Sequence, residues 1–335
     1  MISISDVGVV IQGPILSRGR TMDDLQPRDY DASVNVNKLF AKASEAGAGV
    51  VVVTWEGEDV SNLDPVALNN TLIVEMPKQK WGFRARNNFV GNNKYKQFYS
   101  TLKGAESLSQ RGYKYVLKIR TDQEFPLEVF FQHVSRMSDF EVETRIFTPL
   151  LNLDKPNMFY DFYYFSRTTT MLEFNQTLLS TKELCSNVHF DVFYRWITRH
   201  EKIRIRDLPL IYPRQPHYTI KQINFIISGW SKDFGVLPKD CWRGISWRGE
   251  PFLVSAVKQS FVFTESFSDE IKSQIAERKN SDRSRIDFTA IMSFWISSKL
   301  EDKLRVLRIN LVRLVNKVKH LVRRRRFLSN KDKIE

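Results

Sequence analysis

Four short apolar runs in the first part of the chain constrain its fold more than any other feature. They are rich in β-branched residues and lie at 7–11, 50–55, 72–76 and 115–119. Such runs are typical of strands that are buried on both faces of a sheet. Helical patterns over 34–46 and 94–110 separate them. We therefore predict an α/β fold, in which helices cover both faces of an open, mostly parallel sheet.

Composition supports a large core and points to an anionic partner. Hydrophobic residues make up 42% of the 335 residues and aromatic residues 13%, which excludes a disordered chain. The formal net charge of +13 predicts binding to nucleic acid, anionic lipid or a phosphorylated substrate. The sequence lacks the GxGxxG and GxxxxGKS/T motifs, so a dinucleotide site and a P-loop are both disfavoured.

The cysteines and the N-terminus predict a cytoplasmic protein. Cys185 and Cys241 lack CxxC spacing, which argues against a zinc site or a disulfide framework and suits a reducing compartment. Asp6 interrupts a short apolar start, so no signal peptide is expected. No apolar run approaches the roughly 20 residues that a membrane span needs. We expect a soluble or peripheral protein.

The strand at 115–119 delivers polar groups at its carboxyl end. Arg120, Thr121 and Asp122 follow it directly, and Pro126 ends the segment. Ligands bind at this edge in open α/β sheets. A carboxylate there holds a hard cation, and the cation neutralises a diphosphate. The alternative is a surface ion pair between Arg120 and Asp122 after an ordinary strand.

Other loops near the same edge carry further candidates. The first strand runs into Gln12, Gly13 and Pro14, and Arg18 nearby meets phosphate or else belongs to a solvated loop. Residues 84–93 hold four asparagines and two arginines. Asparagine amides read a base or sugar and arginine forks hold phosphate, although an asparagine also caps the helix that follows.

VVIQGP, VVTWEG, NNFVGNN and KIRTD occur in that order within 7–125. This ordered set resembles the WavE lipopolysaccharide-synthesis family, and the resemblance weakens toward residue 220. It implies a GT-A-type glycosyltransferase with a nucleotide-sugar donor and a lipid-linked or lipopolysaccharide glycan as acceptor. Residues 120–122 then stand where such an enzyme carries Asp-x-Asp. Arginine at the first position leaves one carboxylate, which opens the question whether Mg²⁺ or Mn²⁺ binds or Lys118 and Arg120 supply the charge.

The resemblance and the strand ends together assign the binding residues. The donor-binding residues are Gln12, Gly13, Pro14, Arg18, Thr54, Trp55, Glu56, Arg84, Asn88, Asn92, Lys118, Arg120, Thr121 and Asp122. The metal ligands are Asp122 and His217, the latter after a predicted strand at 203–211. A lone histidine there is alternatively a hydrogen-bonded structural residue.

The second half of the domain supplies candidates for catalysis. We predict strands at 147–153 and 158–166 and helices at 171–179 and 186–197. Asp161 lies among aromatic residues that stack on sugars, or else at the edge of a core strand. Asp191 near the start of the last helix is similar to the general base of inverting GT-A enzymes, with Glu183 in reserve. The alternative is a helix-surface pair of Asp191 with Arg195.

The C-terminal tail is strongly basic and has apolar residues at heptad spacing. Between Lys299 and Arg326, eleven basic residues stand against two acids. A basic amphipathic helix binds an anionic bilayer, whereas a heptad helix pairs with a partner helix as a coiled coil. The apolar positions are Leu304, Leu307, Leu311, Leu314, Val318 and Leu321.

The predicted organisation is a GT-A-like, Rossmann-type domain at 1–265, a helical linker at 266–298 and the tail at 299–335. A donor half ends near residue 125 and an acceptor half spans 126–265. We expect an inverting glycosyltransferase, peripheral on the cytoplasmic face of a bacterial inner membrane, that builds lipopolysaccharide or capsule. The rival is a basic nucleic-acid-binding or scaffold protein with a degenerate, non-catalytic nucleotide-binding core. No nucleic-acid-binding motif occurs in the sequence, so no nucleic-acid partner is expected.

Overall fold

A computed structural model of the chain divides it into two units, Met1–Glu277 and Arg278–Glu335. The structure describes residues 1–19, 28–78, 82–85, 88–91, 93–149, 159–180, 188–200, 229–230, 232–238 and 240–251, all within the first unit. The predicted strand at 203–211, the linker at 266–298 and the tail at 299–335 lie outside these residues. None of the helices in the described part is long and apolar enough to cross a membrane.

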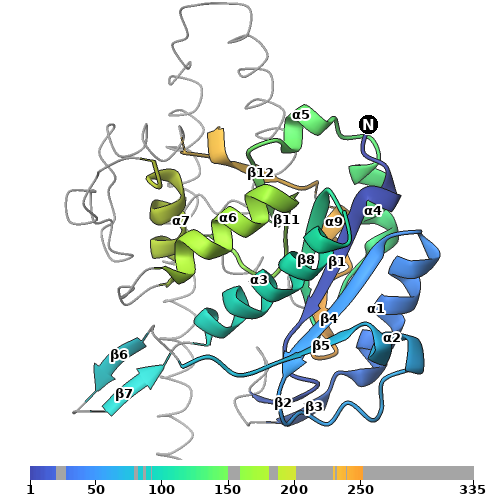
Figure 1. Ribbon diagram of the computed structural model, residues 1–335, viewed down its shortest axis with the longest axis vertical. Coiled ribbons are helices and arrows are strands. Elements are labelled where there is room, and N and C mark those ends of the chain that lie inside the picture. Colours follow the sequence, from blue (N-terminus) through green and yellow to red (C-terminus); the bar gives the residue numbers. More distant parts are fainter. Residues whose placement is uncertain are drawn as a thin grey trace, which may run out of the picture. The chain divides into compact units, whose positions relative to one another are not determined.

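A seven-stranded mixed sheet forms the centre of the described domain (Figure 1). Parallel pairing joins β1 to β4 and β8, β4 to β5, and β10 to β12. Only β11 runs against its neighbours β8 and β10 within this sheet. The predicted α/β fold with an open, mixed sheet is therefore confirmed. From one edge to the other its strands are β12 (Phe234–Val236), β10 (Ile146–Thr148), β11 (Tyr164–Arg167), β8 (Tyr115–Arg120), β1 (Val7–Gln12), β4 (Gly49–Trp55) and β5 (Thr71–Val74).

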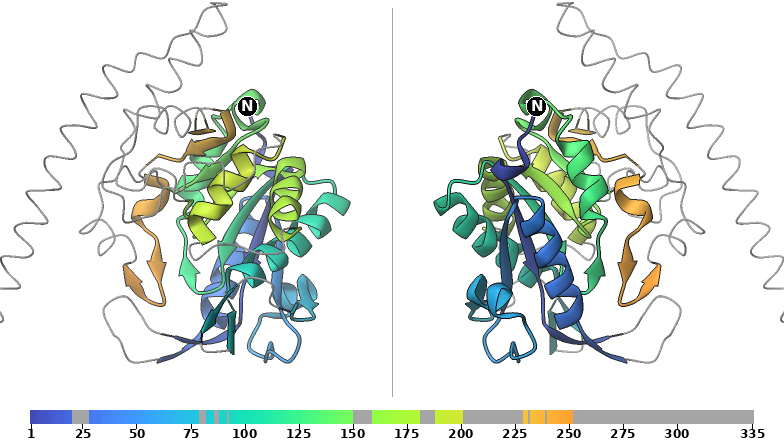
Figure 2. Two further views of the ribbon diagram at one scale, coloured as in Figure 1. Left: turned by 90° about the vertical axis from the view of Figure 1, so that its left-hand side faces the viewer. Right: turned by 90° about the vertical axis from the view of Figure 1, so that its right-hand side faces the viewer.

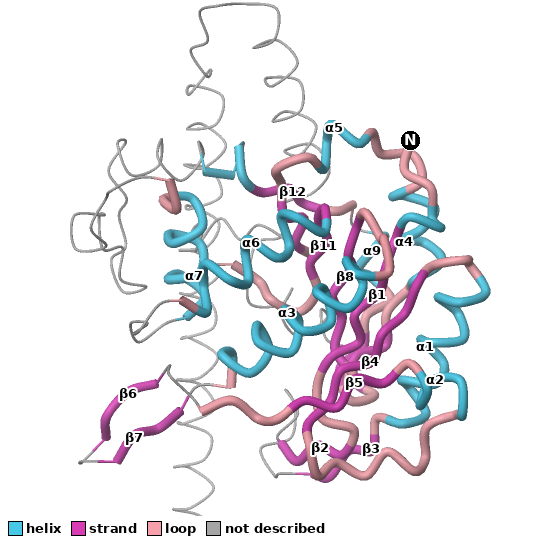
Figure 3. The backbone as a smooth tube through the Cα atoms, viewed as in Figure 1, coloured by secondary structure: helices cyan, strands magenta, loops and turns pink. Residues whose placement is uncertain are grey.

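Helices cover both faces of the sheet, as Figures 1 to 3 show. Each buries an apolar stripe; in α1 the buried residues Val36, Leu39, Phe40 and Ala43 follow helical spacing. One face packs against α1 (Ser33–Glu45), α2 (Pro65–Asn69), α4 (Leu127–Val134) and α9 (Asp240–Arg243). The other packs against α3 (Lys94–Gln110), α6 (Thr168–Leu179) and α7 (Val188–Ile197). The short η1 (Ile4–Asp6) and α5 (Asp139–Val142) pack Ile4 and Val142 against the core on the first of these two faces.

Burial on both faces explains the continuous apolar runs of the central strands. Every residue of β1 and β4 is buried. The helix α3 packs closely on them at Gly104, where an added Cβ would lie 2.5 Å from Cγ1 of Val10. A larger residue at this position would push the helix away from the sheet.

Three small sheets accompany the central one. They are β2 (Leu16–Gly19) with β3 (Arg28–Asp31), β6 (Gly82–Ala85) with β7 (Asn88–Gly91), and β9 (Gln123–Glu124) with β13 (Ser246–Trp247) and β14 (Glu250–Pro251). The pairing of β13 with β9 brings residues 246–247 beside 123–124. The predicted halves on either side of residue 125 thus share one small sheet as well as the central one.

Two predicted strands differ from the observed ones. The strand predicted at 147–153 is β10, which ends at Thr148, and residues 150–158 are not described. The strand predicted at 158–166 begins only at Tyr164. Side chains take the carbonyl groups that a neighbouring strand would need: Lys118 Nζ donates to the carbonyls of Asp161 and Phe162, and Thr148 Oγ1 donates to that of Tyr160.

Candidate functional site

The site lies where the chain changes direction across the sheet. From β1 the chain proceeds to β4 and β5 on one side, and it returns to β8 on the other side of β1. The two strands are parallel, and Gln12 at the end of β1 pairs in register with Arg120 at the end of β8. A switch point of this kind, at the carboxyl ends of the strands, is where open α/β sheets bind ligands.

A cavity of about 300 Å³ opens at this point. Its volume is within the range of small-molecule sites. Seven of the predicted donor-binding residues line it: Gln12, Gly13, Pro14, Trp55, Arg120, Thr121 and Asp122. Eight further lining residues had no assigned role: Leu16, Ser17, Glu58, Met76, Asn93, Lys96, Gln97 and Arg248.

Backbone contacts fix the two loops that form the floor of this cavity. Gly13 has a φ of +137°, and an added Cβ would lie 2.7 Å from Oγ1 of Thr121, so glycine is required here. Thr121 Oγ1 donates to the carbonyl of Pro14 at 2.8 Å, and its amide donates to that of Gln12 at 3.0 Å. From α1, Asn35 Nδ2 donates to the carbonyls of Thr121 and Gln123 at 2.7 and 2.8 Å. The strand ends are held before any ligand arrives.

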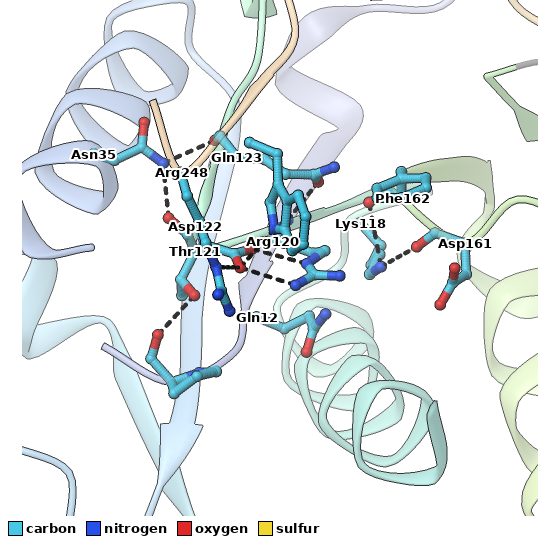
Figure 4. A network of polar contacts seen from close by, with 12 residues as sticks. Gln12, Asn35, Lys118, Arg120, Thr121, Asp122, Gln123, Asp161, Phe162 and Arg248 are labelled. Atoms are coloured by element: carbon cyan, nitrogen blue, oxygen red, sulfur yellow. Dashed lines mark hydrogen bonds and ion pairs between the residues drawn. The ribbon is translucent and has the colours of Figure 1, made fainter. Parts of the chain in front are cut away.

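The carboxylate of Asp122 is buried and binds two arginines (Figure 4). Arg120 donates to it through two parallel bonds, Nε to Oδ1 at 2.8 Å and Nη2 to Oδ2 at 2.9 Å. Oδ2 also accepts from Trp247 Nε1 at 2.8 Å and from Arg248 Nε at 3.1 Å. The indole of Trp247 lies beside both guanidinium carbons, with its ring centroid 5.8 Å from that of Arg120 and 4.9 Å from that of Arg248. We call Arg120, Asp122, Trp247 and Arg248 the Asp122 cluster.

Charge in the Asp122 cluster is positive overall. Burial favours the protonated carboxyl, but Arg120, Trp247 and Arg248 together outweigh it and lower the pKa of Asp122. Burial likewise disfavours the guanidinium, yet Asp122 raises the pKa of Arg120. The buried Nη1 of Arg248 has no hydrogen-bond acceptor among the described residues. A donor left in this state costs free energy that an anionic ligand would recover.

Arg248 reaches the site from a tight hairpin far along the chain. It joins β13 to β14 together with Gly249, and both residues have positive φ, 54° and 78°. Positive φ at both loop positions is the geometry of a type I′ turn, which matches the twist of a hairpin. A non-glycine residue in this conformation is uncommon and is found at functional sites. The sequence WRG had suggested no role for this arginine.

A second buried carboxylate, Asp161, lies behind the cavity wall and does not line it. Lys94 Nζ bonds both its oxygens, at 2.7 and 2.6 Å, and His189 Nδ1 lies 3.8 Å from Oδ1. Burial would raise the pKa of Asp161, but the charges of Lys94, His189 and Lys118 hold it well below its usual range. We call Lys94, Lys118, Asp161 and His189 the Asp161 cluster.

Gln97 of α3 lies between the two clusters and also lines the cavity. In the amide orientation that satisfies both ends, its nitrogen donates to Asp161 and its oxygen accepts from Arg120. Asp161 therefore contacts the site through Gln97. Asp161, which the sequence placed among the candidates for catalysis, is thus a carboxylate that cationic groups enclose.

The described residues do not fit a divalent cation. No three His, Cys, Asp or Glu side chains of the described part come together as a metal site. Both oxygens of Asp122, the predicted ligand, already accept hydrogen bonds from guanidinium or indole groups. A hard cation needs several oxygen ligands, and Asp122 alone does not supply them. The second predicted ligand, His217, lies outside the described residues.

The other predicted residues fall in three groups. Thr54 is buried at the end of β4 and Glu56 is exposed just beyond it, while Lys118 is buried in β8; none of these three lines the cavity. Arg18 in β2, Arg84 in β6, Asn88 in β7 and Asp191 in α7 have described backbones only. Asn92 and Glu183 lie outside the described residues, so their roles stay predictions, as does the base role of Asp191.

The sequence offered only weak indications of the residues that were not assigned. Glu58 follows the end of a strand and is close in sequence to Glu56, which was assigned. Its carboxylate accepts hydrogen bonds from the amides of Ile15 and Leu16 at 3.1 Å. Lys96 and Gln97 belong to the first turns of α3, which begins right after the asparagine-rich segment. Helical register from that start would have placed them near the site.

No protein-family model matches the sequence, and no curated protein matches it. Solved structures with some similarity include a mannose-1-phosphate geranyltransferase from Thermus thermophilus. Its TM-score is 0.33 and its sequence identity 9%, over 56% of this chain and 67% of that chain. Similarity at this level says nothing about the activity of this chain.

Proposed function

We propose that this chain is a glycosyltransferase of the WavE type, which transfers a sugar from a nucleotide donor to a bacterial lipopolysaccharide or capsule glycan. One observation carries the proposal: a single cavity is lined by both apolar and cationic side chains. The apolar ones are those of Trp55, Met76 and Leu16, and the cationic ones are those of Arg120, Arg248 and Lys96. A nucleotide has this polarity, because its base is an apolar ring and its phosphates are anionic.

In the proposed reaction an acceptor hydroxyl attacks the anomeric carbon of the donor sugar. The bond from that carbon to the diphosphate oxygen breaks, and its electron pair leaves with the nucleoside diphosphate. A general base takes the hydroxyl proton, and Asp191 on α7 keeps this role as a prediction. Direct displacement by this path inverts the anomeric centre.

Release of a nucleoside diphosphate tests the proposal. Purified full-length protein is incubated with a panel of uridine, guanosine, thymidine and adenosine diphosphate sugars, and the freed diphosphate is quantified. We expect release from one nucleotide class, and a large loss in Arg120→Met, which removes a cavity guanidinium. The exposed Arg136, which does not line the cavity, provides the control Arg136→Met. No release from any donor would contradict the proposal.

The rival nucleic-acid function makes the opposite prediction for the tail. Deleting residues 299–335 removes eleven of the basic residues counted above. A nucleic-acid binder would lose its activity with them, whereas the proposed enzyme would still hydrolyse or transfer its donor with a soluble acceptor. Retained nucleotide-sugar turnover with lost nucleic-acid binding would reject the rival.

We also propose that the tail holds the enzyme at the cytoplasmic face of the inner membrane, beside its lipid-linked acceptor. Each basic residue near an anionic surface contributes about 1 kcal/mol, and salt weakens the attraction. Sedimentation with anionic and neutral vesicles at low and high salt tests this. A tail that forms a coiled coil instead would give a dimer or trimer without vesicle binding.

A further inference from the structure

The arginines that line the cavity carry more positive charge than the carboxylate of Asp122 can neutralise. Arg120 and Arg248 both line the cavity, and Asp122 is the carboxylate that binds them. Guanidinium groups stay charged at any pH at which the protein is folded. One negative charge therefore faces two permanent positive charges, and one guanidinium nitrogen of Arg248 lacks an acceptor among the described residues.

We infer that Arg120 and Arg248 bind the diphosphate of the donor directly, and that this arginine pair replaces a divalent cation. The inference rests on the proposed function and specifies how its site works. Asp122 is then a positioning residue that orients two arginines. Its sequence position had suggested a metal ligand.

The hydrogen bonds of Asp122 carry the first step of the argument. A carboxylate offers about four lone-pair sites. Oδ1 accepts one bond, from Arg120, and Oδ2 accepts three, from Arg120, Trp247 and Arg248. A cation would find at most one open lone pair, on Oδ1, and it would sit against two guanidinium groups of the same sign. Repulsion at such short range opposes cation binding.

Fixed geometry carries the second step. Two parallel bonds to Asp122 hold the guanidinium of Arg120. The hairpin turn fixes the backbone of Arg248, and so does the hydrogen bond of 2.9 Å from its amide to the carbonyl of Asp122. Trp247 packs against both groups. Because little side-chain entropy remains to be lost, an anion binds at lower cost than it would to two mobile side chains.

The chemistry of the leaving group carries the third step. As the bond to the sugar breaks, negative charge grows on the diphosphate oxygen. Guanidinium donors that are already in place stabilise this charge without reorganising. Arginine also matches the oxygens of a phosphate with two parallel bonds, which lysine cannot do.

Binding of nucleoside diphosphates to the full-length protein tests the inference without any substitution. Titration calorimetry measures the binding of uridine, guanosine, thymidine and adenosine diphosphate. Inorganic pyrophosphate probes the pair of Arg120 and Arg248 alone, which we call the arginine clamp. Each titration is made in EDTA and again with Mn²⁺. We expect one nucleotide to bind in EDTA with nearly the affinity that it has in Mn²⁺, and higher salt to weaken this binding.

Arg248→Lys tests the new residue. It keeps the charge but loses the fork that bonds Asp122 and the ligand together, so we expect at least about tenfold weaker binding in EDTA. The matched control is Arg136→Lys, an exposed arginine outside the cavity, which should bind as the original protein does. Arg120→Lys is the second clamp variant, with the same expectation. Thermal unfolding in the absence of ligand shows which variants fold.

The outcomes separate the inference from the function. Nucleotide binding that requires Mn²⁺ would overturn the arginine clamp and leave the glycosyltransferase proposal standing. Pyrophosphate binding in EDTA without binding of any nucleotide would support the clamp and overturn the nucleotide-sugar function. A folded Arg248→Lys protein with unchanged affinity would reject the role of Arg248. Absence of binding by every probe in both buffers would overturn both proposals.

Discussion

Two buried carboxylates on neighbouring parts of the fold are surrounded by cationic groups of different kinds. Asp122 opens onto the cavity and binds arginines, whereas Asp161 lies behind the cavity wall and is surrounded by Lys94, Lys118 and His189. Both clusters bring more cationic groups than carboxylates into a buried region. They differ in whether those groups can release a proton.

The Asp161 cluster reduces its own charge. Lys118 is fully buried, and burial lowers its pKa to about 7, so this lysine loses its proton near neutral pH. The arginines of the Asp122 cluster have no such route, because guanidinium does not deprotonate in proteins. Their surplus charge persists until an anion arrives. The comparison supports the proposal that the Asp122 cluster binds an anionic ligand, whereas Asp161 lies behind the wall of the site and contacts it through Gln97.

The largest expected effect is that of Asp122→Asn. It leaves two partly buried guanidinium groups without their buried carboxylate, and breaking a buried ion pair costs about 3–5 kcal/mol. We expect the free energy of unfolding, measured in urea, to fall by this amount. Pyrophosphate should restore part of it, because a ligand that binds the folded state stabilises that state. If pyrophosphate restored none of the lost free energy of unfolding, the Asp122 cluster would not differ from the Asp161 cluster in binding an anion.

Asp161→Asn should cost less, about 3 kcal/mol, at the lower end for a broken buried pair. Lys94 loses its bonds to the carboxylate of Asp161, but Lys118 can stay neutral and so limits the cost. The same urea titration with added pyrophosphate should show no rescue, because Asp161 does not line the cavity. If pyrophosphate rescued both variants equally, the Asp161 cluster would also be an anion site.

The strands of both clusters were predictable from sequence for a local reason. The runs at 7–11, 50–55 and 115–119 became β1, β4 and β8 with ends that differ by no more than one residue. Burial on both faces makes such strands apolar throughout, and this property is readable in a short window. The same reasoning placed Gln12, Trp55 and Asp122 at one edge of the sheet, where the cavity lies.

The partners of these carboxylates were not predictable, because they come from distant segments. Arg248 is 126 residues from Asp122 in sequence, and its hairpin reaches the site only through pairing with β9. The aromatic run before β11 was predicted to be part of a strand, and Phe159 and Tyr163 are indeed core residues. It does not pair as a strand, because Lys118 binds carbonyl groups of that segment. Contacts of this kind depend on tertiary structure, and no local pattern specifies them.

The smallest expected effect, over a single pH unit, is the pH dependence that Lys118 contributes to stability. The unfolded chain keeps this proton up to a pH of about 10.4, whereas the folded chain releases it near pH 7. Between these values the unfolded state binds more protons, so the free energy of unfolding rises with pH, by up to about 1.4 kcal/mol per unit. Lys118→Met lacks this term. Urea titrations across the window should therefore show the original protein gaining stability relative to the variant as pH rises. A constant difference would mean that Lys118 stays charged, and the contrast between lysine and arginine clusters would fail.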